Sequence, residues 1–269
     1  MTATTQKDLS KNIAEWGWRM ETITQPDGTI TSIQVPLTSE EFLHPQEGYH
    51  LPNSTFHDDS ASDAKDMLTR RYANDPETGI FRDLIIKWDS SDLRDNCPDV
   101  FIAFGIRNKD QNRTEFWVAE EGARPALIIE VVSPRYRKED REIKVKQYAK
   151  ARVPEYVIID RRRQRNQMIE EVLGYRLVDD QYLPLTPDEE GRILCETIGV
   201  WIGLEEGRVV MMDAETGERL LNSRELQQQA NQAEQRANQA EQRANEAEQR
   251  AAKLEELLRS QGINPDDII

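Results

Sequence analysis

The stretch Ala126-Leu127-Ile128-Ile129-Glu130-Val131-Val132 decides the fold, because a single charged side chain interrupts its aliphatic residues. Such a run is typical of a strand that is covered on both faces, as the central strands of parallel and mixed sheets are. A second apolar run, Tyr156 to Ile159, follows a segment (137–152) in which apolar residues recur at helical spacing. Strand, helix and strand in this order predict a right-handed crossover, so we expect an α/β (α+β) fold with a mixed sheet flanked by helices.

The sequence on both sides of this unit adds further elements. Alternating or apolar-rich runs predict strands before and after it, at residues 81–88, 99–104, 174–177, 193–202 and 208–212. Turn and capping patterns predict a hairpin within 18–36 around Pro26-Asp27-Gly28, a short helix opened by a capping box at Thr38-Ser39-Glu40-Glu41, and a longer helix from Asp63 to Tyr72.

Residues 230–250 repeat the seven-residue unit Ala-Asn-Gln-Ala-Glu-Gln-Arg, with one change in the third copy. Alanine and leucine occupy successive a and d positions from Leu226 to Leu258, which predicts a long helix that pairs as a coiled coil. Because alanine buries little apolar surface, a single exposed helix held by alanine propensity and Glu–Arg pairs stays open as the alternative.

The charge of the chain is unevenly distributed. The 269 residues carry a net charge of −15, which argues against sequence-independent coating of nucleic acid, since that needs a broad positive field. Between Arg135 and Arg165, however, twelve Lys or Arg stand against five Asp or Glu, a local net of +7. This window is either an electrostatic footprint for a phosphate backbone or a solvated helix face.

Cysteine and histidine placement argues against a zinc site. Cys97 and Cys195 lie far apart, and the three histidines form no ligand pattern near them, so both thiols are expected to fill the core in a reducing compartment. No run approaches the roughly 18 apolar residues of a membrane span, and residues 1–10 carry no apolar signal region. We therefore expect a cytoplasmic protein without a membrane partner.

Two carboxylates occupy strand positions at which catalytic or metal-binding side chains are often found. Glu130 lies inside the apolar central strand, and Asp99 follows Pro98 at the start of another strand. Burying an unpaired charge costs several kcal/mol, so Glu130 must be paired, protonated or bound to a metal. An ordinary buried salt bridge is the alternative explanation.

An ordered set of motifs spanning roughly residues 37–221 resembles the Uma family of restriction endonucleases, a branch of the PD-(D/E)xK nuclease superfamily. The motifs are Pro98-Asp99, Ile129-Glu130-Val131-Val132-Ser133-Pro134, Asp140-Arg141-Glu142-Ile143-Lys144, Tyr148-Ala149 and Val153-Pro154-Glu155-Tyr156-Val157-Ile158-Ile159-Asp160. The resemblance implies a restriction-endonuclease-like domain at 37–221. It would follow an N-terminal extension at 1–36 and precede a heptad-repeat helix at 222–260 and a tail at 261–269.

The resemblance also implies a metal site. In the superfamily two strand-borne carboxylates and a main-chain carbonyl hold a hard cation, which assigns Asp99, Glu130 and the Val131 carbonyl as ligands of Mg²⁺ or Mn²⁺. Magnesium prefers oxygen ligands and lowers the pKa of a bound water.

The sequence departs from the superfamily pattern at Val132, where a lysine is usual. The Uma family is similar in lacking that lysine and carries one on the following helix, which matches Lys144 and implies a catalytic role for it. The alternative is a simple ion pair with Asp140 one helical turn away, and Lys146 is a second, less well oriented candidate.

Other polar residues stay outside the predicted site. Asp63 and Lys65 match the family's early helix only loosely, and His57 is expected on the surface. Asp160, beside three arginines, is expected to form a structural ion pair or helix cap.

The implied function is metal-dependent hydrolysis of DNA phosphodiester bonds by an endonuclease that works as a dimer through its C-terminal helix. The alternative is a nuclease fold without activity that acts in assembly or binding through the same coiled coil. The sequence leaves the recognition sequence, the choice of DNA over RNA and the biological pathway open.

Overall fold

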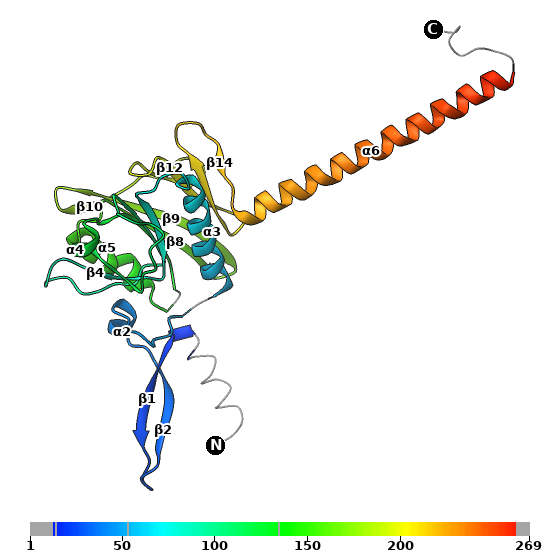
Figure 1. Ribbon diagram of the computed structural model, residues 1–269. Helices are drawn as coiled ribbons and strands as arrows, with labels where there is room; N and C mark the ends of the chain where they lie inside the picture. Colours follow the sequence, from blue (N-terminus) through cyan, green and yellow to red (C-terminus); the bar gives the residue numbers. More distant parts are fainter. Residues whose placement is uncertain (1–12, 14, 53, 134, 262–269) are drawn as a thin grey trace. The chain divides into compact units, whose positions relative to one another are not determined.

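The predicted central strand lies in the middle of a six-stranded sheet in the computed structural model of the protein (Figure 1). β7 (Pro125–Val131) and β8 (Glu155–Gln164) are parallel neighbours at the centre of the order β10-β9-β8-β7-β5-β3. The other neighbours are antiparallel: β3 (Thr78–Arg82), β5 (Val100–Phe104), β9 (Gln167–Val178) and β10 (Gln181–Pro184). The predicted mixed sheet is confirmed.

The structure describes residues 13, 15–52, 54–133 and 135–261. The chain divides into two compact units, Met1–Leu220 and Leu221–Ile269. The expected lack of a signal region at 1–10 and the expected tail at 261–269, apart from Gln261, lie outside the described residues.

One face of the sheet is covered by the crossover helix. The π-helix η1 (Glu139–Ile143) continues directly into α5 (Lys144–Lys150). Its buried Tyr148 packs with Ile128, Tyr156 and Ile158 of the central strands. A two-stranded parallel sheet of β4 (Ile85–Lys87) and β6 (Glu115–Trp117), followed by α4 (Val118–Glu121), completes this side.

The opposite face packs against a long helix and a second sheet. Met67 and Leu68 of α3 (Thr55–Arg71) share a core with Ile129 and Val157 of the central strands. The second sheet is antiparallel and has the order β11 (Ile193–Cys195), β12 (Val200–Glu205), β13 (Arg208–Asp213) and β14 (Arg219–Leu220). Cys195 fills this core, as expected of a buried thiol.

Helix α3 begins eight residues before its predicted start at Asp63. The Ser54 hydroxyl caps it by accepting a hydrogen bond from the His57 backbone N–H, at 3.2 Å. The added turns bury Ser60 and Ala61, which are small and give no apolar periodicity in the sequence. The prediction was therefore wrong at this end, and His57 belongs to the first turn of the helix.

Other boundaries differ because turns interrupt apolar runs. The strand predicted at 81–88 is split into β3 and β4 at Asp83, whose φ is +50°. The run at 193–202 is split into β11 and β12. β9 begins at Gln167, seven residues before the strand predicted at 174–177.

The N-terminal elements follow the prediction closely. β1 (Trp18–Thr24) pairs antiparallel with β2 (Ile30–Pro36) around the expected turn. Thr38 caps α2 (Ser39–Leu43) in a capping box with Glu41.

The second unit contains α6 (Ser223–Ser260), a helix of 38 residues that is roughly 57 Å long at 1.5 Å per residue. Asn222 opens it with a capping box to Glu225, and none of its residues is buried. The predicted helix is confirmed, whereas its pairing as a coiled coil stays a prediction. Among the described residues, no helix combines the length and apolar character that crossing a membrane requires.

Candidate active site

Asp99 and Glu130 lie opposite each other on neighbouring antiparallel strands. Val100 of β5 pairs with Ile129 of β7, so the residue before Val100 faces the residue after Ile129. Directly opposed side chains on one sheet face have Cβ atoms about 5 Å apart. Both side chains are buried, with exposed fractions of 9% for Asp99 and 2% for Glu130.

Glu130 is held by a cation and a hydroxyl. Its Oε1 lies 3.0 Å from Lys144 Nζ and accepts a 2.7 Å hydrogen bond from the Tyr148 hydroxyl. Burial raises the pKa of Glu130 to about 8, although the Lys144 ammonium acts in the opposite direction. The carboxyl therefore gains or loses its proton according to which cations lie beside it.

Lys144 connects two buried acids at the first turn of α5. Its Nζ lies 2.9 Å from Asp140 Oδ1 as well as 3.0 Å from Glu130, and it stands 4.9 Å from the centre of the Phe42 ring. Burial lowers the pKa of Lys144, but the surrounding carboxylates outweigh it and raise the pKa above its ordinary value. The Lys144–Asp140 pair predicted as the alternative does form, but the same ammonium also reaches Glu130. Lys146 is exposed, as its helical direction indicated.

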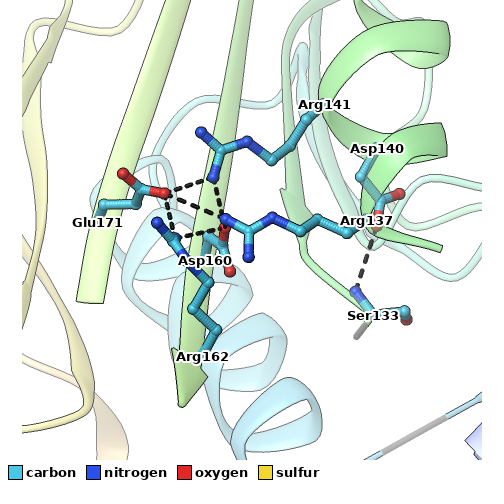
Figure 2. A network of polar contacts seen from close by, with 7 residues as sticks. All are labelled: Ser133, Arg137, Asp140, Arg141, Asp160, Arg162 and Glu171. Carbon is cyan, nitrogen blue, oxygen red and sulfur yellow. Dashed lines mark hydrogen bonds and ion pairs between the residues drawn. The ribbon is translucent and has the colours of Figure 1, made fainter. Parts of the chain in front are cut away.

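Asp140 fixes the loop after β7 to the crossover helix. Its Oδ2 accepts a 3.2 Å hydrogen bond from the Ser133 backbone N–H (Figure 2), and its main-chain carbonyl accepts one from the Tyr156 hydroxyl at 2.9 Å. Burial raises the pKa of Asp140, while Lys144 lowers it. The sequence indicated this residue only as a helical partner of Lys144.

His57 is the site residue that the sequence prediction placed wrongly. Instead of lying on the surface, its side chain is 14% exposed, and Nε2 stands 3.1 Å from Asp99 Oδ2. Burial lowers the pKa of His57, but the Asp99 carboxylate outweighs it and raises the pKa to about 9. Ser54 is a typical N-cap residue, and recognising it in the sequence could have placed His57 in the first turn of α3.

Asp99 therefore has two partners on one oxygen. Besides the imidazole, its Oδ2 accepts a 2.6 Å hydrogen bond from the Val131 backbone N–H. Burial alone would raise the pKa of Asp99, yet His57, Lys144 and this N–H lower it below its ordinary value.

These side chains line a cleft of about 890 Å³. Its wall includes the loop 45–52 before α3 and, beside the predicted residues, Asp83 and Cys97. Cys97 thus borders the cleft, where burial and the nearby carboxylates raise its pKa to about 12. Asp63 is absent from the wall and lies 3.7 Å from Arg208 on the other side of α3.

The donor set suits a hard divalent cation with few protein ligands. Contacts within the described residues use Oδ2 of Asp99 and Oε1 of Glu130, which leaves Oδ1 and Oε2 for a ligand. In that part of the chain, no three His, Cys, Asp or Glu side chains are grouped to hold one metal ion. Magnesium fits such a site because it commonly binds one or two carboxylates and keeps several waters.

Comparison with known proteins matches more than half of the chain to a described family. The model of the Uma2 family, described as "Putative restriction endonuclease", matches residues 51–205, which include Asp99, Glu130 and Lys144. The resemblance predicted from the sequence is thereby confirmed. No curated protein matches the chain.

One solved structure resembles part of this chain. It is that of "a putative nuclease belonging to DUF820" from Anabaena variabilis ATCC 29413, with 13% sequence identity and a TM-score of 0.41. The similarity covers 66% of this chain and 82% of that chain.

Proposed function

Because this chain belongs to the Uma2 family, we propose that it is a metal-dependent endonuclease that hydrolyses phosphodiester bonds of DNA. The observation that carries the proposal is the cross-strand pair of buried carboxylates, Asp99 and Glu130, with the Lys144 ammonium 3.0 Å from Glu130. The arrangement supports a divergent PD-(D/E)xK site whose lysine comes from the crossover helix.

Asp99 and Glu130, with the Val131 carbonyl, would hold Mg²⁺ or Mn²⁺. Such an ion supplies a bound water of lowered pKa and offsets charge on the phosphate. The chain's own groups do the positioning: the Val131 N–H and His57 orient Asp99, and the Tyr148 hydroxyl orients Glu130.

Lys144 serves as a cation and hydrogen-bond donor. Its pKa is raised by the carboxylates around it, so it stays protonated, and an ammonium has three donors and no acceptor. We therefore assign it to stabilising negative charge on a phosphate oxygen.

The test is calorimetric titration of Mn²⁺ into the full chain, followed by a plasmid-nicking assay on the same samples. Glu130→Gln and Asp99→Asn should each lose metal binding and nicking together. Asp63→Asn is the matched control, because it removes a buried carboxylate outside the cleft and should retain both activities. Variants of Asp99 and Glu130 that nick and bind Mn²⁺ like the wild type would refute the site.

The alternative function, an assembly module without activity, is motivated by Val132 in place of the usual lysine and by the ion pair that occupies Glu130. A folded wild-type protein that takes up no Mn²⁺ or Mg²⁺ and still binds a partner through α6 would favour it.

We also propose that two copies pair through α6, in parallel. With Ala230 at position a, each of the three repeats has a glutamate at e (Glu234, Glu241, Glu248) and an arginine at g (Arg236, Arg243, Arg250). In a parallel pair g of one helix meets e of the next heptad of the other, which joins Arg to Glu. An antiparallel pair would bring like charges together. Two active sites in one assembly suit cleavage of both DNA strands.

A further inference from the structure

Three arginines converge on two carboxylates at the end of the central sheet (Figure 2). Arg137 and Arg141 come from the turn that leads into η1 and from η1 itself, and Arg162 comes from β8. Arg141 Nη1 lies 2.6 Å and Arg162 Nη1 3.0 Å from Asp160 Oδ2, and Arg137 also contacts that oxygen. All three contact Glu171, which pairs with Asp160 across β8 and β9. We call these five residues the guanidinium cluster.

The guanidinium cluster has an excess of positive charge and of hydrogen-bond donors. Three cations face two carboxylates, and every contact ends on Asp160 Oδ2 or Glu171 Oε1. Each guanidinium uses one terminal nitrogen for these contacts within the described residues, although it carries five N–H donors. The three side chains are 25–32% exposed, so an anion from solution can reach the remaining donors.

Repulsion among the three guanidiniums is visible at Arg137. Burial lowers its pKa, and Arg141 and Arg162 lower it further, against the opposing effect of Asp160. A third anion would relieve this repulsion. An Arg–phosphate contact is commonly bidentate and charge-assisted, which suits the unused donors.

The guanidinium cluster lies on the same sheet face as Glu130. In the parallel register Glu130 pairs with Ile158, so Asp160 is one strand across and two residues further along. Strand spacing and rise put the two Cα atoms about 8 Å apart. Figure 2 shows two active-site residues, Asp140 and Ser133, beside the guanidinium cluster. Asp140 precedes Arg141 in η1, and its side chain accepts a hydrogen bond from the Ser133 backbone N–H.

We propose that the guanidinium cluster binds a backbone phosphate of a polynucleotide, adjacent to the phosphate that reacts at Glu130 and Lys144. The inference rests on the proposed function and narrows its substrate to a chain with several phosphates. It also assigns part of the basic window between residues 135 and 165 to phosphate binding, in preference to a merely solvated face.

The first test measures binding without cleavage. Labelled duplex DNA is titrated with the full chain in a Glu130→Gln background, by fluorescence anisotropy at several salt concentrations. Arg141→Gln and Arg162→Gln should each weaken binding roughly tenfold and reduce the salt slope by about 1. Arg161→Gln is the matched control: Arg161 is the neighbour of Arg162, pairs with Glu170 instead, and lies outside the guanidinium cluster.

Arg141→Lys guards against a folding defect, because it keeps a cation beside Asp160 while removing the forked donors. It should fold like the wild type, as judged by circular dichroism, and still bind DNA more weakly. If Arg141→Lys, Arg141→Gln and Arg162→Gln bind DNA as tightly as the Arg161→Gln control, the proposal is wrong.

A second test uses bis(p-nitrophenyl) phosphate, a diester with a single phosphate, with Mn²⁺ and the active chain. The loss in the Arg variants should be about tenfold greater on DNA than on this small diester. Equal losses on both substrates would overturn the proposal, because the arginines would then act on the reacting site. The wild type could also hydrolyse neither substrate while the Arg variants alone bind DNA more weakly. That result would refute the proposed function and support the phosphate subsite.

Discussion

At the residue scale, the lysine of the active site is also a structural cation. Lys144 is buried and lies within 3.0 Å of two carboxylates that are buried as well, so its removal leaves acids without a counterion. Breaking a buried pair by removing one partner costs about 3–5 kcal/mol. We therefore expect Lys144→Met to destabilise the metal-free protein by that order.

The measurement is urea denaturation in EDTA. Lys146→Met is the control, since Lys146 is exposed on the same helix and its replacement should change stability by no more than about 0.5 kcal/mol. Equal urea midpoints for the two variants would show that Lys144 is not needed to stabilise the buried carboxyl groups of Glu130 and Asp140.

A second residue-scale prediction concerns pH. The pKa of His57 is raised from its ordinary value of 6.5 to about 9 in the folded protein, because Asp99 outweighs the effect of burial. A raised pKa gives stability that is fully present below pH 6.5 and is lost as pH rises through 9. Chelated wild-type protein should therefore lose stability between pH 6.5 and 9.

Thermal denaturation in EDTA at a series of pH values checks this, with His57→Gln for comparison. The variant should be less stable at pH 6 and show a flatter profile toward pH 9. If the stability of the variant falls with pH as steeply as that of the wild type, His57 is not the cause of the pH dependence.

These residues also show how far sequence reasoning reached into the site. Glu130 was singled out because a carboxylate in an apolar strand needs a physical reason, and the family resemblance then assigned Asp99 and Glu130 as metal ligands. The structure brings the two together across β5 and β7. Lys144 followed from a family resemblance. His57 was missed because the first turns of α3 bury small residues, which leave no periodic signal.

At the element scale, apolar periodicity found the strands that are buried on both faces and failed where charges pair across strands. Near the ends of β8 and β9, Arg161 lies opposite Glu170 and pairs with it, and Arg162 contacts Glu171, which lies opposite Asp160. These ion pairs take the place of apolar packing in holding the two strands together. Such a charged hairpin has no apolar pattern to detect, so β9 was predicted too short.

Helix α6 allows an element-scale prediction. Glu234, Arg236 and Glu241 have no opposite charge three or four residues away, so a lone helix gains little from them, whereas a parallel pair joins Arg236 to Glu241 of the second copy. Sedimentation equilibrium at tens of micromolar should show a dimer of the wild type. A wild-type monomer under these conditions would contradict the pairing.

Charge reversal tests the orientation of the same helix. Changing the three g arginines to Glu (Arg236, Arg243, Arg250) should dissociate the dimer, as should changing the three facing e glutamates to Arg (Glu241, Glu248, Glu255). Mixing the two variants should restore a heterodimer. If either variant alone stays dimeric, the helices pair in another orientation, because in an antiparallel pair like charges already face each other in the wild type.

At the scale of the whole molecule, the buried acids of the active site lower the stability of the folded protein, and a bound metal ion would offset this effect. The acids Asp99, Glu130 and Asp140 are buried near one another, and the pKa of Glu130 is raised to about 8 by burial. A ligand that binds only the folded state stabilises it by about 2.7 kcal/mol at one hundred times its dissociation constant. Saturating Mn²⁺ should therefore raise the melting temperature of the wild type, and EDTA should reverse the shift. Glu130→Gln should melt at the same temperature with and without Mn²⁺, and Asp63→Asn should respond like the wild type. An equal Mn²⁺ shift in Glu130→Gln would place the ion elsewhere in the protein.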